Sequence, residues 1–169
     1  RAIHMLGKGR LEVIDVPEPE VPPGHVLVRI QASAICGSEM HAFRGDAPHK
    51  SNAGHEAAGV IVDAGDSSRL KAGDRVGIGA VHGCGKCEWC LHGKQTFCSA
   101  KGVHSGMHQE LTAPPERACH PLPDAVPIDV GVLLTGDGFG VPFHAGPKLG
   151  LRPGNRLAVF GCGPVGLGH

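Results

Sequence analysis

The sequence predicts a mainly β domain of about 145 residues, followed by the opening strand of an α/β unit. Short runs of alternating or β-branched apolar residues fill the first half of the chain. Glycine and proline, 27 and 14 of the 169 residues, separate these runs, and helical patterning begins only at residue 127. We therefore expect one domain over residues 1–145 and the beginning of a second over residues 146–169.

The expected strands and helices can be placed in chain order. In HVLVRIQASAI (25–35), apolar residues such as Val26, Val28 and Ile30 alternate with more polar ones, which is typical of a strand with one buried face. Two further β-rich runs, AAGVIVDAG (57–65) and DRVGIGAV (74–81), end in glycine and aspartate turn signals. Helical patterns follow in PIDVGVLLTG (127–136) and FGVPFHAGPKLG (139–150), and NRLAVFGCGPVGLG (155–168) resembles a strand that runs into a glycine-rich turn.

Composition argues against several classes of partner. Lysine and arginine total 16 and aspartate and glutamate total 16, so no net charge attracts nucleic acid or an anionic membrane. No apolar run approaches the ~18 residues of a spanning helix, and the first residues do not resemble a secretory signal. We expect a cytoplasmic protein with no nucleic-acid or membrane partner, whose seven cysteines are reduced thiols, metal ligands or catalytic groups.

Four cysteines in HGCGKCEWCLHGKQTFC (82–98) follow the pattern C-x2-C-x2-C-x7-C. These spacings let four thiolates converge on one cation, and four protein ligands leave a tetrahedral zinc ion no open position. A redox pair, a disulfide loop and an iron–sulfur cluster are the alternatives. We favour a structural zinc site, and we expect neither Cys119 nor Cys162 to bind metal. The four predicted ligands are Cys84, Cys87, Cys90 and Cys98.

Three other motifs accompany this cluster in a recognisable order. AICGSEMHAFRG (34–45), NAGHEAAG (52–59), the four cysteines and GCGPVG (161–166) together resemble the medium-chain zinc-dependent alcohol and polyol dehydrogenases. The resemblance covers essentially the whole chain. It implies a GroES-like β-barrel catalytic domain with a four-cysteine zinc lobe, followed by the first strand of a truncated Rossmann domain.

The resemblance also implies a second, catalytic zinc ion, giving two per chain. Cys36 and His55 match its first two ligands, and Asp137 matches the third. Glu56 matches a carboxylate that approaches the metal when water or substrate leaves. Without the resemblance, Asp137 would be interpreted as a helix-capping residue beside Gly136.

Two further residues match a proton relay. Ser38 matches a hydroxyl beside the substrate oxygen, and His41 matches a histidine that passes the proton towards solvent. The alternatives are a helix N-cap for Ser38 and an ordinary helix-face residue for His41. At Glu39 the family commonly has aspartate, which braces the zinc-bound histidine, so the extra methylene calls the bracing of His55 into question.

The motif GCGPVG follows an apolar run, as a dinucleotide-binding turn does. We expect NAD or NADP to bind there, although the chain stops before the helix and the acidic residue that would distinguish the two cofactors. The residues predicted to contact the cofactor are Gly161, Gly163, Pro164, Val165 and Gly166.

The sequence thus predicts an oxidoreductase that converts an alcohol, polyol or sugar to a carbonyl compound. We expect a homo-oligomer, a dimer or tetramer, when the protein is complete, and no turnover by these residues alone. The alternative is a non-catalytic zinc-binding module or a truncated scaffold. An open metal site is of no use to a scaffold, and for that reason we favour the enzyme.

Overall fold

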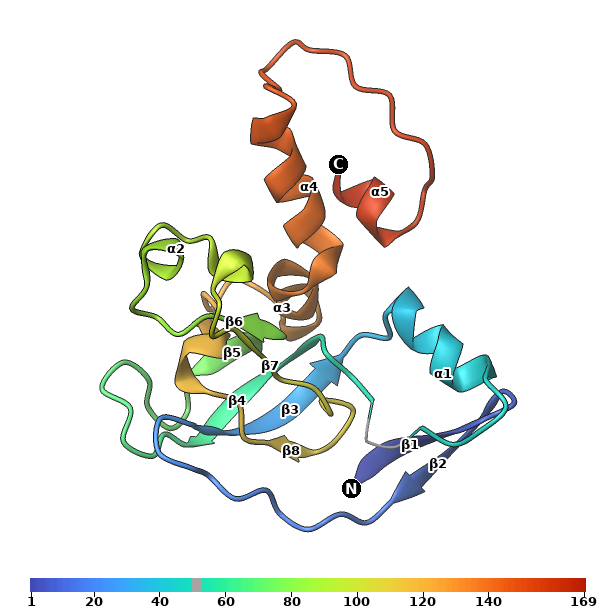
Figure 1. Cartoon of the computed structure of the whole chain (residues 1–169), viewed down its shortest axis with the longest axis vertical. Coiled ribbons are helices and arrows are strands. Elements are labelled where there is room, and N and C mark those ends of the chain that lie inside the picture. The colour runs from blue at the N-terminus through green and yellow to red at the C-terminus, as the bar shows by residue number, and fades with distance from the viewer. Residues whose placement is uncertain (50–52) are drawn as a thin grey trace.

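The computed structural model describes residues 1–49 and 53–169, and in this part the chain forms three β-sheets (Figure 1). The largest has five antiparallel strands in the order β8-β3-β4-β5-β9, and two smaller sheets pair β1 with β2 and β6 with β7. The strands are β1 Ala2–Gly7, β2 Arg10–Ile14, β3 Leu27–Ser33, β4 Ala57–Asp63, β5 Arg75–Ile78, β6 Val81–His82, β7 Gly102–Val103, β8 Leu111–Thr112 and β9 Cys119–Pro121.

The main core lies against one face of the five-stranded sheet. Val26 and Val28 are fully buried at the start of β3 whereas Arg29 is exposed, which confirms the alternation that predicted this strand. The strands expected near residues 57 and 74 are also confirmed, as β4 and β5. Their buried apolar side chains meet in one cluster with Met107, and its other large members are Ile61, Leu70, Val76 and Ile78.

The expected barrel is not closed by hydrogen bonds among the described residues. The strands β8 and β9 end the sheet on opposite sides and are two and three residues long, too short to pair along a common edge. A single bridge between His25 and Pro115 continues the ladder past β8. The five-stranded sheet is therefore open in the part of the chain that the structure describes, and a bridge between Ala2 and Gln109 joins the beginning of β1 to the segment before β8.

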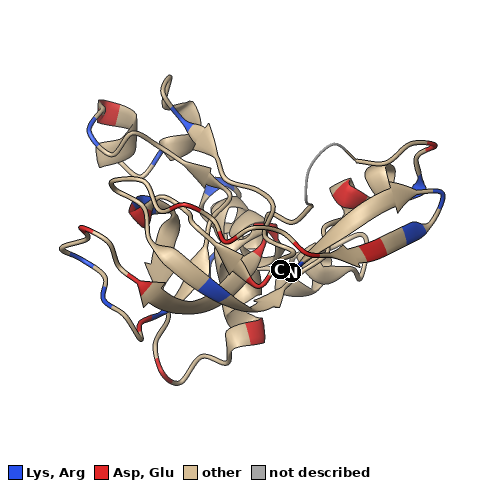
Figure 2. Cartoon of the chain, turned by 90° about the horizontal axis from the view of Figure 1, so that it is seen from below, with Lys and Arg blue, Asp and Glu red and all other residues tan. Residues whose placement is uncertain are grey.

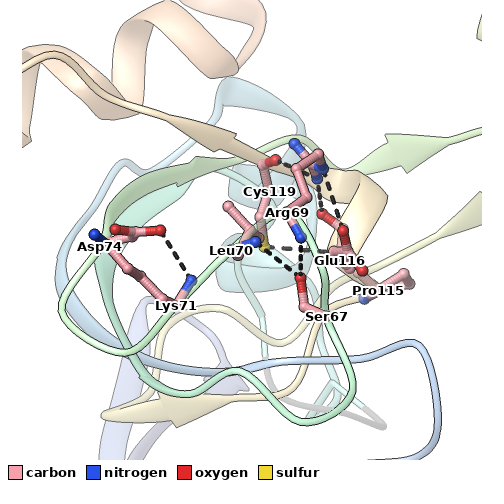
Figure 3. Close-up of polar contacts among 8 residues, drawn as sticks. All are labelled: Ser67, Arg69, Leu70, Lys71, Asp74, Pro115, Glu116 and Cys119. Carbon is pink, nitrogen blue, oxygen red and sulfur yellow. Dashed lines mark hydrogen bonds and ion pairs between the residues drawn. The ribbon is translucent and has the colours of Figure 1, made fainter.

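A loop connects β4 to β5 and is fastened to the segment before β9 (Figure 3). Within the loop, the hydroxyl of Ser67 accepts hydrogen bonds from the backbone N–H groups of Arg69 and Leu70. The Arg69 guanidinium donates to a carboxylate oxygen of Glu116 at 3.2 Å and to the carbonyl of Cys119 at 3.2 Å. Burial raises the pKa of the Cys119 thiol to about 12, so this cysteine is a protonated core residue.

Both predicted helices of the later segment are confirmed. The helices are α1 Met40–Arg44, α2 Glu88–Leu91, α3 Ile128–Thr135, α4 Asp137–Lys148 and α5 Pro164–Gly168, with 3-10 turns η1 Gly37–Glu39, η2 Gln95–Phe97 and η3 Glu116–Ala118. Helix α3 packs on β3, β4 and β5, where Val132 is buried with Leu122 and Ala58. A Cβ atom at Gly77 would collide with Thr135, so glycine at this position lets α3 approach β5.

The C-terminal segment differs from our expectation in two ways. Residues 156–160 form no strand and are exposed, with Phe160 98% accessible, because the described part of the chain provides no neighbouring strand for them to pair with. We also expected the chain to stop before the helix after GCGPVG, but a short helix, α5, begins at Pro164 and packs on α4 (Figure 1). The domain boundary predicted after residue 145 falls inside α4 and stays a prediction.

Charged residues of both signs are interspersed along the ribbon in Figure 2, in keeping with the formal net charge of zero. In the described residues no helix is long and apolar enough to cross a membrane.

We predict that His104 makes the fold sensitive to acid. Its ring forms a 2.8 Å hydrogen bond with the hydroxyl of Thr112, and burial, together with His25 and His82, lowers the pKa of His104 to about 4. The unfolded state takes up this proton near pH 6.5 and the folded state does not. The free energy of unfolding should therefore fall between pH 6.5 and about 4, by at most ~1.4 kcal/mol per pH unit.

Urea unfolding at pH 7.5 and pH 5 measures this effect. The variant His104→Gln should lose less stability between the two pH values than the unmodified chain, whereas His144→Gln, a change at an exposed site on α4, should not differ from it. An equal acid loss in all three proteins would contradict the prediction.

Candidate metal centres

The four cysteines of the predicted lobe converge on one point. One sulfur from each of Cys84, Cys87, Cys90 and Cys98 lies within 4.8 Å of all the others. The lobe is local: α2 begins directly after Cys87, and η2 ends directly before Cys98. Four sulfur atoms in a cluster of this size match the ligand set of a closed tetrahedral zinc site.

Backbone N–H groups stabilise the thiolate forms that a cation requires. Hydrogen bonds from the N–H groups of Lys86 and Cys87 lower the pKa of the Cys84 thiol to about 6. The N–H of Cys84 in turn points at the sulfur of Cys98 at 3.4 Å and lowers the pKa of that thiol. The tight turns thus favour the thiolate form at Cys84 and Cys98 before any cation binds. At Cys87 a backbone hydrogen bond is outweighed by burial and by the neighbouring cysteines, which raise the pKa of that thiol to about 11.

A second cluster contains all the side chains that we matched to the catalytic zinc site. Ligand atoms of Cys36, His55, Glu56 and Asp137 all lie within 4.8 Å of one another. They come from three distant segments: the residue before η1, the two residues before β4, and the first residue of α4. Cys36 and His55 are partly buried, Glu56 is buried and Asp137 is exposed, so the cluster lies at the surface of the described residues.

Glu56 ties the start of α4 to the start of β4. Its carboxylate accepts a 2.9 Å hydrogen bond from the backbone N–H of Asp137. A Cβ atom at Gly136 would lie 2.9 Å from the Glu56 carboxyl carbon, so glycine permits this close approach. The N-cap of α4 is Gly136 and Asp137 is the first helical residue, which leaves its carboxylate directed at the cluster rather than used as a cap.

Glu39 braces the other two ligands, despite its extra methylene. Its two carboxylate oxygens accept backbone hydrogen bonds from Cys36 at 2.9 Å and from Gly54 at 2.6 Å. One of these oxygens is also 3.7 Å from the Nδ1 atom of His55. The longer side chain therefore reaches both the cysteine segment and the histidine segment.

His108 is a contributor that the sequence did not reveal. Its Nε2 atom lies 3.2 Å from a Glu39 carboxylate oxygen, and its side chain is buried. It belongs to none of the motifs, and 69 residues separate it from Glu39, so only the three-dimensional fold brings the two together.

The two relay candidates lie on the helical segment next to Cys36. Ser38 is in η1 and His41 is in α1, and both are exposed. Their placement within five residues of Cys36 puts them beside the cluster along the chain, and their roles stay predictions.

The glycine-rich motif shares no residue with the two clusters and lies at the beginning of α5. Gly161 has a φ of +109°, and a Cβ atom at Gly166 would collide with the carbonyl of Gly161, so this tight turn requires glycine at both positions. Pro164 is the first residue of α5 and Gly163 is its N-cap. The motif forms the turn that we predicted for it, and its role in cofactor binding stays a prediction.

Comparison with known proteins gives one family throughout. The family model described as the alcohol dehydrogenase GroES-like domain matches residues 22–124. An alcohol dehydrogenase of Geobacillus stearothermophilus is 36% identical over 174 residues, covering 96% of this chain and 50% of that protein. A probable D-xylulose reductase A of Aspergillus terreus is 34% identical, covering 90% of this chain and 46% of that protein.

Solved structures agree with this result. The alcohol dehydrogenase TADH from Thermus sp. ATN1 superposes with a TM-score of 0.88 at 29% identity, covering 99% of this chain and 52% of that one. The chain thus spans about half the length of the relatives that it matches.

Proposed function

The chain belongs to the medium-chain zinc-dependent alcohol and polyol dehydrogenases, and from this premise we propose that it provides the catalytic domain of an enzyme that oxidises an alcohol or polyol to a carbonyl compound with NAD or NADP. One observation carries the proposal. Sulfur, imidazole and carboxylate ligands from three distant segments, Cys36, His55 and Asp137, meet at the surface, where a substrate has access.

The two clusters suit two different zinc ions. Four thiolates, at Cys84, Cys87, Cys90 and Cys98, complete a tetrahedral shell and fit a structural site. Cys36, His55 and Asp137 supply three ligands and leave the fourth position for substrate. When bound, zinc would supply a Lewis acid that lowers the pKa of an alcohol, and a nicotinamide cofactor would supply the hydride acceptor.

Other residues supply ligand support, proton transfer and cofactor binding. Glu56 holds the N–H of Asp137 and keeps a buried carboxylate next to the other ligands, close enough to approach the metal. Ser38 takes the proton of the substrate hydroxyl, and His41 passes it to solvent. Gly161, Gly163, Pro164, Val165 and Gly166 receive the pyrophosphate of the cofactor.

The proposal also includes the substrate class, the cellular location and the oligomeric state. An alcohol, polyol or sugar is the partner, and the relative named as a D-xylulose reductase supports a polyol. A cytoplasmic homo-oligomer without a nucleic-acid or membrane partner remains our expectation.

We predict that the reduced chain binds two zinc ions. Cys84→Ser should remove one ion and lower the unfolding midpoint by more than ~5 °C, because metal binding contributes folding free energy at a closed site. Cys36→Ser should remove one ion with little change in the midpoint, because that site lies at the surface. Metal analysis and thermal unfolding measure the two effects.

A matched control is Cys162→Ser, which changes an exposed cysteine outside both clusters and should retain two ions. If Cys36→Ser destabilises the chain more than Cys84→Ser does, the structural and catalytic assignments are reversed.

We predict that Asp137 is a metal ligand. Asp137→Asn replaces a carboxylate oxygen by a weaker amide oxygen, so zinc at the open site should be lost to a chelator at about tenfold lower concentration. Loss of the negative charge at the first turn of α4 should cost only ~0.3–1 kcal/mol. Asp129→Asn alters the first turn of α3 in the same way and should leave zinc retention unchanged. Unchanged retention in both variants would make Asp137 a helix-start residue only.

We predict that Ser38 and His41 act in sequence in the enzyme that contains this chain. Ser38→Ala should reduce kcat for alcohol oxidation by ~10²–10⁴, the typical contribution of a positioned proton-transfer group. His41→Ala should reduce it less, because His41 is the later group of the proposed relay and solvent can partly replace it as the proton acceptor. Steady-state rates between pH 6 and pH 9 test the order, and negligible losses in both variants would contradict the relay.

A further inference from the structure

We propose that His108 is a positioning residue for the open metal centre, acting through Glu39 on the segments that carry Cys36 and His55. The inference rests on the proposed function in one respect, that this centre binds zinc. The contacts that support the inference are all made between residues of this chain.

The Glu39 side chain is 7% exposed, so its carboxylate needs partners for both oxygens. Within the described part of the chain, each oxygen lies against one backbone N–H group and one imidazole. Oε1 accepts from the N–H of Gly54 and lies 3.7 Å from Nδ1 of His55. Oε2 accepts from the N–H of Cys36 and lies 3.2 Å from Nε2 of His108. Among the described residues, loss of the His108 contact would leave Oε2 with a single donor, the N–H of Cys36, and would remove one of the contacts that fix the orientation of the carboxylate.

Both ring nitrogens of His108 have defined partners. An ionised carboxylate only accepts hydrogen bonds, so Nε2 carries a hydrogen and donates it to Glu39. In the neutral ring Nδ1 is then an acceptor, and the hydroxyl of Ser33 lies 2.9 Å away to donate to it. The side chain is 7% exposed, so water competes little for either bond.

The backbone of His108 also holds the segment before His55. Its N–H donates to the carbonyl of Ala53 at 2.9 Å, and the N–H of Met107 donates to the carbonyl of Gly54 at 3.1 Å. Gly54 has a φ of +108°, and a Cβ atom there would collide with the backbone nitrogen of His108. Only glycine permits the backbone at position 54 to approach His108 this closely. The contact therefore fixes the backbone position of the next residue, His55.

The length of the Glu39 side chain allows its carboxylate to make all four of these contacts. An aspartate is shorter by one carbon–carbon bond, about 1.5 Å, and cannot keep all four contacts from the same backbone position. Glu39 and His108 are thus a matched pair, in which the longer acid reaches both ligand segments and the histidine holds it in place. Groups that orient metal ligands in this way typically change metal affinity 10–100-fold when they are removed.

Two near-isosteric variants separate the two contacts of the ring. In His108→Gln the amide nitrogen takes the place of Nε2 and keeps the bond to Glu39, whereas in His108→Asn it takes the place of Nδ1 and loses that bond. The measurements are the affinity of the open centre for Zn²⁺, by chelator competition, and the visible absorption spectrum of Co²⁺ bound there. The four-cysteine site of the same chain is the internal control.

We expect His108→Gln to bind within a few-fold of the unmodified chain, and His108→Asn to bind 10–100-fold more weakly with an altered Co²⁺ spectrum. A merely structural role would lower stability equally in both variants and leave affinity and spectrum unchanged, which would overturn the proposal. If the unmodified chain binds metal only at the four cysteines, the proposed function fails instead, and the positioning role fails with it.

A double-mutant cycle gives an independent test. Glu39→Asp should itself weaken Zn²⁺ binding, and adding His108→Asn should cost little more, because the contact is already lost. Additive losses in the double variant would show that His108 does not act through Glu39. Hydrogen exchange of the Cys36 and Gly54 amides, faster in His108→Asn but not in His108→Gln, reports the same coupling in a chain without metal.

Discussion

A buried carboxylate must find hydrogen-bond donors, and in this domain that requirement positions the candidate ligands of the open cluster. Glu39 takes its donors from the backbone at Cys36 and Gly54, and Glu56 takes one from the backbone at Asp137. Each of these amides belongs to a candidate ligand or to the residue next to one. The desolvation cost of the two acids is thus offset by bonds that also draw three distant segments together.

The two metal centres differ in what holds them. The four-cysteine lobe is contained in residues 84–98 and depends on its own tight turns, whose amides lower the pKa values of the Cys84 and Cys98 thiols. The open centre combines residues from 36 to 137, so it exists only when η1, β4 and α4 are packed together. The two sites should therefore respond differently to substitutions. The four-cysteine site should be weakened mainly by changes to its own ligands, whereas the open site should also be weakened by any change that moves η1, β4 or α4.

The same difference explains what could be predicted from the sequence. Short cysteine spacings and the alternation of β3 depend on local chemistry, so the lobe, the central strands and the helices α3 and α4 were predictable. The hairpin of β1 and β2 was missed although Leu11 and Val13 alternate with polar residues in β2, because β1 lacks clear alternation and the turn uses Lys8 at a φ of 54° between two glycines. His108 was missed because its role depends on a partner 69 residues away, and no motif marks such a pairing.

The segment after α4 shows where local preference is insufficient. Leu157, Val159 and Phe160 form a β-prone apolar run, yet they are exposed and unpaired within the described chain. A strand gains its stability from neighbouring strands and from covering helices, and neither is supplied here by the residues that form the metal centres. All the proposed zinc ligands, by contrast, already lie within reach of one another. The glycine-rich turn therefore forms without a strand before it, and the grouping of the candidate zinc ligands depends on contacts among η1, β4 and α4 rather than on this exposed run.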